Sequence, residues 1–226
     1  MRSMIRVLVR LALVLACSGP LWALDLSERD KVSGLKEALV QGAGQAVTML
    51  SKPDGFLGNP KVRIPLPDTL EKAAPVLRSL GMGRQLDELV TTMNRAAEAA
   101  VPETRGLLEA AVKQMSVTDV QAILTGGDDA GTRYFKDKTS GPLFERLLPI
   151  VTRATEKLEL TKRYEALTKK AARVKLVKEE DARIDRYVTG RALDGLYRMI
   201  ADEERAIRRN PAAAAGNLAR KVFGAL

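Results

Sequence analysis

Apolar residues recur three and four positions apart along most of the chain, which is the spacing of amphipathic helices. Residues 83–100 carry such a stripe, and residues 182–208 carry a longer one. Few segments alternate with the period of two that strands need. The pattern predicts helices over about 28–50, 69–80, 83–100, 102–115, 117–124, 128–138, 143–158, 161–173, 182–208 and 212–226.

Polar and small residues indicate how several of these helices begin and pack. Ser27 is a predicted N-cap, with Asp30 three residues later as in a capping box. Ser116 or Thr118 is expected to start the helix that ends before residues 126–127. Gly34, like the other glycines of the first helix, weakens that helix locally and would permit the close approach of a neighbour.

Glycine and proline indicate where helices should end or bend. Gly81 is expected to stop one helix, and Pro75 to bend or split it. A break is expected at residues 139–141 (TSG), and a kink at Pro149.

Residues 51–68 differ from the rest of the chain, because they are rich in proline and glycine. Val62, Ile64 and Leu66 alternate there with polar or proline positions, as in an edge strand. An ordered loop anchored by Phe56 and Leu57 explains the pattern equally well. A long irregular segment in a helical protein is either a packed connector or a recognition loop. The candidate recognition residues are Asp54, Gly55, Phe56, Leu57 and Asn59.

The pattern as a whole predicts an all-α fold, a single compact multi-helix bundle over residues 24–226. At most one short edge strand or extended loop is expected near residues 61–66. Apolar residues make up 46% of the chain and aromatic residues only 4%, so the core must consist of aliphatic side chains. We find no internal repeat and no linker long enough to divide two domains.

Residues 1–23 have the parts of a secretory signal peptide. Three arginines precede the apolar run 11–16, a helix break follows at residues 18–20, and Ala23 offers a cleavage position. Cleavage there predicts a periplasmic or secreted protein. The alternative is processing before Cys17, which would give a lipoprotein anchored through that residue. Loss of residues 1–23 lowers the formal charge from +9 to +6 and removes the only cysteine.

Composition excludes several kinds of catalytic site. The chain contains no histidine and one cysteine, so a Ser-His-Asp triad, a Cys-His dyad and the usual zinc sites cannot be formed. We therefore assign no catalytic, cofactor-binding or metal-binding residues and expect no cofactor.

The strongest charge feature is a basic stretch at residues 162–178, where seven basic residues accompany Glu165 alone. Such a patch would attract anionic lipids, lipopolysaccharide, nucleic acid or an acidic protein face, although it also suits a solvated helix face. Nucleic acid fits an exported protein poorly. The candidate interaction surface consists of Lys162, Arg163, Lys169, Lys170, Arg173, Lys175 and Lys178.

Two groups of acidic residues are candidate sites. Residues 125–129 (TGGDD) suit a glycine helix stop followed by an aspartate cap better than a ligand site. The second group could supply paired carboxylates for hydrolysis, but it also suits the negative start of a solvated helix. That group consists of Glu179, Glu180, Asp181 and Asp185.

Several segments together resemble an exported bacterial family, domain of unknown function family forty-one ninety-seven. They are residues 32–39 (VSGLKEAL), 52–60 (KPDGFLGNP), 64–67 (IPLP), 93–98 (MNRAAE), 124–130 (LTGGDDA) and 192–197 (ALDGLY). The resemblance covers nearly all of the mature chain and implies export and a helical fold. It implies no activity, cofactor or catalytic residue.

Three hypotheses about function follow. The first is a non-enzymatic envelope protein that binds a protein or an anionic surface. The second is a helical carrier of an apolar ligand, held near Met93, Met115, Phe144 and Leu148. The third is a hydrolase that uses carboxylates only.

Overall fold

The computed structural model describes residues 26–157, 160–173, 184–214 and 216–225, and in these ranges the chain is all α without a strand. The helices are α1 (Glu28–Leu50), α2 (Asp68–Leu77), α3 (Gly83–Ala100), α4 (Arg105–Lys113), α5 (Val117–Leu124), α6 (Ala130–Lys157), α7 (Leu160–Arg173), α8 (Ile184–Arg209) and α9 (Asn217–Gly224). A π-helical turn, η1 (Arg78–Met82), joins α2 to α3. Two 3-10 turns, η2 (Val101–Thr104) and η3 (Pro211–Ala213), lie before α4 and α9. The all-α prediction is confirmed.

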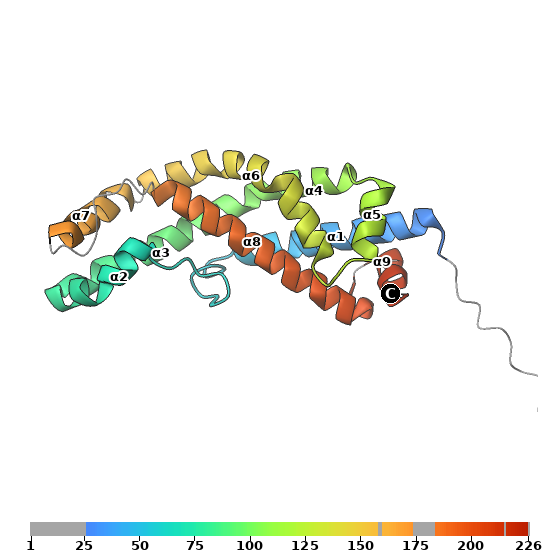
Figure 1. The fold of residues 1–226 in the computed structure, drawn as a ribbon, viewed down its shortest axis with the longest axis horizontal. Helices are drawn as coiled ribbons and strands as arrows, with labels where there is room; N and C mark the ends of the chain where they lie inside the picture. Colours follow the sequence, from blue (N-terminus) through green and yellow to red (C-terminus); the bar gives the residue numbers. More distant parts are fainter. Residues whose placement is uncertain (1–25, 158–159, 174–183, 215, 226) are drawn as a thin grey trace, which may run out of the picture.

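The helices form an elongated bundle, with α8 running along much of its length (Figure 1). α8 packs against α6 and α1, and α1 packs against α9. At one end α2 and α3 contact α7, while α5 and α9 lie at the other end (Figure 1). Buried apolar side chains from all of these helices belong to one continuous core. The chain is therefore a multi-helix bundle, as predicted.

Two predicted helix starts are confirmed by their capping hydrogen bonds. The Asp30 amide donates to Ser27 Oγ at 3.1 Å, which satisfies one of the free N–H groups at the start of α1. Ser116 and Asp119 form a complete capping box at the start of α5. The predicted range 83–100 coincides with α3.

The predicted break at residues 139–141 is wrong, because α6 runs without interruption from Ala130 to Lys157. The Thr139 hydroxyl bonds the Phe135 carbonyl at 2.6 Å and lies 2.9 Å from the Tyr197 hydroxyl, so it is satisfied inside the helix. Pro142 and Pro149 are exposed, so the carbonyls that lose an N–H partner lie near solvent. Packing of α6 against α8 overrides the local signals.

The turn between α2 and α3 is placed by Gly81. Its φ of 78° lies in the left-handed region, which glycine enters without steric cost. Pro75 lies within α2 and does not split it. The predicted stop at Gly81 is confirmed.

Gly34 permits close packing of the first and last helices. A Cβ at this position would lie 2.6 Å from Val222 Cγ2 and 2.7 Å from the Leu218 carbonyl oxygen. Because one of these atoms belongs to the α9 backbone, any side chain at residue 34 would push α9 away from α1. The predicted close approach is confirmed here.

A buried carboxylate joins α8 to the start of α6. The two oxygens of Glu204 accept hydrogen bonds from Gly131 N at 2.9 Å, Thr132 N at 2.8 Å and Thr132 Oγ1 at 2.8 Å. Arg208 pairs with the same carboxylate at 3.0 Å. Glu204 therefore caps α6, where the helix dipole favours a negative charge.

Among the described residues, no helix is both long enough and apolar enough to cross a membrane.

Candidate functional site: the 52–67 loop on α3 and α8

The irregular segment between α1 and α2, residues 52–67, is an ordered loop and not an edge strand. Its fully buried residue Phe56 anchors it, and Leu57 is half-buried. Tight turns shape its first half, where Gly55 N donates to Lys52 O at 2.9 Å and Gly58 N to Asp54 O at 3.0 Å. Of the two predicted alternatives, the ordered loop is confirmed.

Glu98 of α3 holds the first half of the loop. Its Oε1 accepts from Phe56 N at 3.1 Å and from Leu57 N at 3.2 Å, and its Oε2 pairs with Arg95 at 2.7 Å. Arg95 also pairs with the loop residue Asp54 at 2.8 Å. The hydrogen bonds to Glu98, followed by those to Asp54, raise the pKa of the Arg95 guanidinium above its ordinary value. Side chains from one turn of α3 thus bond two backbone N–H groups and one carboxylate of the loop through charge-assisted hydrogen bonds.

Asn94, also on α3, holds the second half. Its Oδ1 accepts from Ile64 N at 2.8 Å, and its Nδ2 donates to Ile64 O at 2.9 Å. The same Nδ2 donates to Val90 O at 2.8 Å. Asn94 and Ile64 are both buried, so an unpaired backbone group at this position would be costly.

α8 supports the loop from the other side through Gly195. A Cβ at this position would lie 2.7 Å from Phe56 Cε1 and 3.2 Å from Val62 Cβ, so glycine is what lets the loop rest on the helix. Farther along α8, the Tyr187 hydroxyl donates to the carbonyls of Pro65 at 3.2 Å and Leu66 at 3.3 Å.

An ion pair completes the attachment to α8. Lys61 Nζ lies 2.7 Å from Asp202 Oδ2, and Arg205 lies 2.5 Å from Asp202 Oδ1. The hydrogen bond from Lys61 is the largest of the causes that lower the pKa of Asp202, and Arg205 adds to it. Burial acts in the opposite direction but is outweighed.

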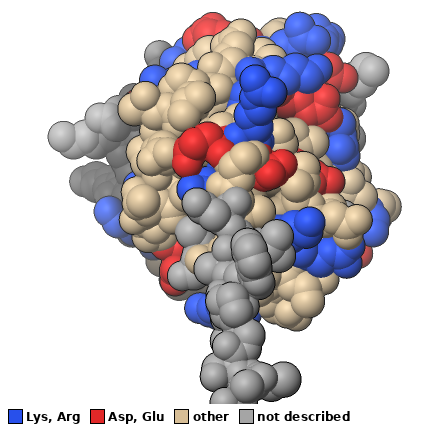
Figure 2. Space-filling view, turned by 90° about the vertical axis from the view of Figure 1, so that its right-hand side faces the viewer, with Lys and Arg blue, Asp and Glu red and all other residues tan. Residues whose placement is uncertain are grey.

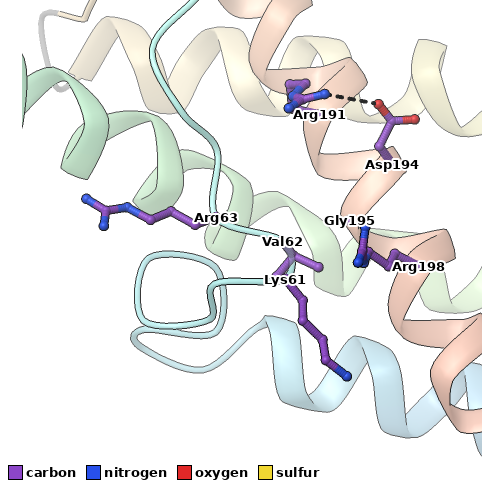
Figure 3. A pocket seen from close by; sticks show the side chains of 7 residues that line it. All are labelled: Lys61, Val62, Arg63, Arg191, Asp194, Gly195 and Arg198. Atoms are coloured by element: carbon purple, nitrogen blue, oxygen red, sulfur yellow. Dashed lines mark ion pairs between the residues drawn. The ribbon is translucent and has the colours of Figure 1, made fainter.

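A hollow of about 270 Å³ lies where the loop meets α8 (Figure 3). Two cations line it from the loop, Lys61 and Arg63, and two from α8, Arg191 and Arg198. Its other lining residues are Val62, Asp194 and Gly195. Arg191 Nη1 is 3.9 Å from Asp194, the outer limit of an ion pair, and Lys61 and Arg63 extend away from each other in Figure 3. We call this feature the basic hollow.

The five residues predicted for recognition mostly serve to anchor the loop, and few of them are available to a partner. Phe56 is buried, Gly55, Leu57 and Asn59 are partly buried, and Asp54 is exposed but paired with Arg95. The cations Lys61 and Arg63 were missed as site residues. The sequence contained a signal for them: the alternation that buries Val62 and Ile64 places residues 61 and 63 on the exposed side of the segment.

Four of the six segments that carry the family resemblance meet here. Residues 52–60 and 64–67 form the loop, residues 93–98 belong to α3 and residues 192–197 to α8. Asn94, Glu98 and Gly195, which fix the loop, come from these segments. The sequence showed the segments but not that they meet.

The predicted basic stretch lies partly on α7, at the end of the bundle formed with α2 and α3 (Figure 1). Arg163 pairs with Glu88 of α3 at 2.7 Å. Arg173 ends the helix, while Lys175 and Lys178 lie outside the described residues. The exposed part, called here the α7 surface, is Lys162, Arg163, Lys169 and Lys170.

The opposite end of the bundle has a different charge pattern. Figure 2 shows that Lys and Arg side chains alternate there with Asp and Glu, with uncharged residues between them. This face therefore presents both signs of charge interspersed.

The acidic residues predicted as candidate sites form structural hydrogen bonds or ion pairs where the structure describes them, as Asp185 and Asp129 show. Asp185 is buried at the start of α8 and accepts from Thr152 Oγ1 at 3.0 Å and from Arg186 N at 2.9 Å. Glu179, Glu180 and Asp181 lie outside the described residues. In the 125–129 segment, Gly126 N donates to Ile123 O and Asp129 pairs with Arg133 of α6. No three acidic or cysteine side chains gather at metal-binding distance in the described ranges.

Three of the four residues expected to line an apolar carrier site belong to the core or pack against it. Met93 and Met115 are buried, and Phe144 is half-buried against the same cluster. Arg186 of α8 lies over the Phe144 ring, 5.1 Å from its centroid. Leu148 is half-buried on α6.

The fold and this surface define a class: an all-α bundle that holds an ordered loop with a basic hollow beside it. The chain belongs to the family described as "Protein of unknown function (DUF4197)", whose model matches residues 25–224. The expected family membership is confirmed. Neither the curated proteins nor the solved structures include a significant match to the chain.

Proposed function

We propose that this protein is an exported, non-enzymatic binding module of the bacterial envelope. Its basic hollow engages an anionic partner, either an acidic protein face or an anionic surface. The observation that carries the proposal is the fixed loop beside four cations: Glu98, Asn94 and Gly195 hold the loop in one position on the bundle. A preformed surface binds with less loss of conformational entropy than a mobile loop.

The charge of the hollow supports an anionic partner. The side chains of Arg63 and Arg198 form no hydrogen bond or ion pair in the part of the chain that the structure describes. Guanidinium groups suit carboxylate and phosphate partners, because their planar N–H donors match two oxygens at once. The α7 surface adds a second basic area at one end of the bundle.

Export is part of the proposal and rests on the signal-like residues 1–23, which lie outside the described residues. Cleavage after Ala23 would release a periplasmic or secreted protein with Leu24 as its first residue. N-terminal sequencing of the mature protein tests this. Palmitate labelling that is lost in Cys17→Ser would instead establish a lipoprotein.

The binding test compares two variants with equal changes of charge. Arg191→Glu with Arg198→Glu reverses the α8 side of the hollow, and Lys169→Glu with Lys170→Glu reverses part of the α7 surface. Each protein is used for pull-down from envelope extract and for co-sedimentation with anionic vesicles at 0.1 and 1 M salt. We expect the first variant to lose the partner and the second to retain it, with binding weaker at high salt.

Retention of the same partners and vesicles by both variants would refute the proposed role of the basic hollow. Loss in the α7 variant alone would move the site to the α7 surface. Circular dichroism of each variant provides the folding control, since all four side chains are exposed.

A further inference from the structure

We infer that the basic hollow binds a phosphate monoester, a group with one phosphorus atom and close to two negative charges. This inference rests on the proposed function and specifies the chemistry of its site. Three features of the hollow lead to it: its net charge, its size, and the way the neighbouring backbone is already bonded.

The charge balance of the hollow favours an anion with more than one negative charge. Four cations line it, and Asp194 is the one carboxylate in the lining. Asp202, which pairs with Lys61 at 2.7 Å, is itself balanced by Arg205 at 2.5 Å. Three positive charges therefore remain in excess. A phosphate monoester carries about −1.5 to −2 at neutral pH, whereas a phosphodiester or a single carboxylate carries −1. The monoester therefore neutralises the hollow most fully.

The size of the hollow favours a small polar group. Its volume of about 270 Å³ lies just below the ~300–1,000 Å³ of typical pockets for drug-sized ligands. Val62 is the only apolar side chain in its lining, so an apolar ligand would gain little. Three of the four cations are arginines, the residue type that binds phosphate through two parallel hydrogen bonds.

Backbone hydrogen bonding argues against an extended acidic peptide as the ligand. A peptide that adds as a strand needs free N–H and C=O groups along an edge. Both groups of Ile64 are bonded to Asn94. The carbonyls of Pro65 and Leu66 accept from Tyr187. Recognition at this place must therefore come from the charged side chains.

Geometry assigns different parts to the cations. Arg191 and Arg198 are seven residues apart on α8, about 10 Å along the helix axis. Asp194 and Gly195 lie between them (Figure 3). Each guanidinium has to turn toward the hollow to meet a bound phosphate, and Arg198, which has no partner in the described chain, can do so without breaking an ion pair. Arg198 is thus expected to contribute most to affinity.

The test measures binding of the full mature protein to two forms of the same chemistry. Isothermal titration with glycerol 3-phosphate tests a soluble monoester, and dimethyl phosphate serves as the diester control. Co-sedimentation with vesicles that contain phosphatidic acid tests a lipid monoester, with phosphatidylglycerol as the diester control. We expect each monoester to bind about tenfold more tightly than its diester, the effect of one charge-assisted hydrogen bond.

A matched pair of variants locates the binding. Arg198→Gln is expected to weaken monoester binding about tenfold, whereas Lys169→Gln on the α7 surface should leave it unchanged. Binding in one of the two monoester arms supports the inference and identifies the ligand's source as soluble or as lipid.

Three results would overturn the inference: no monoester binding in either arm, equal binding of monoester and diester, or undiminished binding by Arg198→Gln. If a pulled-down partner is nevertheless lost in the Arg191→Glu, Arg198→Glu variant, the proposed binding function stands and only the ligand class is wrong. If neither a partner nor a phosphate is bound, both proposals fail.

Discussion

Asn94 gives Ile64 the same pair of hydrogen bonds that a residue on a neighbouring strand would give. The side-chain amide accepts from Ile64 N at 2.8 Å and donates to Ile64 O at 2.9 Å. The 61–66 segment therefore keeps the alternation of a strand while it belongs to no sheet in the described structure. A helix side chain replaces the missing partner strand.

Substitution of Asn94 by Leu should destabilise the protein. It leaves two buried backbone groups of Ile64 without partners, and each unsatisfied group costs about 1–3 kcal/mol. We expect a loss of at least about 2 kcal/mol in the free energy of unfolding, or roughly 4–8 °C in Tm for a chain of this size. Asn94→Asp should retain acceptance from Ile64 N but lose both donated bonds. Thermal denaturation that ranks the two variants equal to wild type would contradict this role.

Gly195 and Gly190 both lie in α8, so substitutions at the two positions form a matched pair. Gly195→Ala places a methyl group 2.7 Å from Phe56 Cε1, so the loop must shift, at about 1–3 kcal/mol. Gly190 has no atom within 4 Å of the position of an added Cβ, so Gly190→Ala should stabilise α8 by about 0.5–1 kcal/mol. Chemical denaturation measures both changes. A similar sign for the two variants would show that the loop does not press on residue 195.

Glu204 is predicted to be one of the most sensitive charged residues. Glu204→Gln breaks a buried pair with Arg208 and replaces one of the oxygens that accept from α6 by a donor, which should cost about 3 kcal/mol. Its neighbour Glu203 is the control. Burial raises the pKa of Glu203, so its charged form is disfavoured in the fold and Glu203→Gln should cost little at neutral pH. Equal losses in both variants would refute the capping role of Glu204.

The ion pair between Lys61 and Asp202 should be visible in a pH titration. Because the pKa of Asp202 is lowered in the fold, its contribution to stability is present above the unfolded pKa and is lost as pH falls through the folded one. Lys61→Met removes the hydrogen bond that lowers the Asp202 pKa most, so this pKa should rise. Arg205 still lowers it in part. Carboxyl NMR measures the pKa directly. Lys52→Met, another exposed lysine of the loop, should leave it unchanged.

Local sequence signals predicted the helices and their caps well. Ser27, Ser116 and Gly81 act through neighbours within four residues, so their roles can be read from spacing. The break expected at residues 139–141 was wrong because the Thr139 hydroxyl finds the Phe135 carbonyl and the distant Tyr197. That contact depends on how α6 packs against α8.

The candidate site was less predictable than the helices, because it too depends on contacts between residues far apart in the sequence. The loop was recognised from its prolines and glycines, but the residues that hold it lie about 30 to 140 positions away. The basic hollow combines Lys61 and Arg63 with cations of α8, and neither pair is unusual in its own segment. The basic stretch that begins on α7 stands out in the sequence because its charges lie close together along the chain.

The contact between α1 and α9 has a consequence for synthesis. Gly34 lies against Val222, so the first helix after residue 27 is covered by the last helix of the described chain. A growing polypeptide cannot cover this face of α1 until residues 217–224 have left the ribosome. Until then the apolar side of α1 is available to chaperones. A product truncated before residue 217 would keep that side of α1 exposed. Proteases would therefore degrade the truncated product faster than the full-length chain.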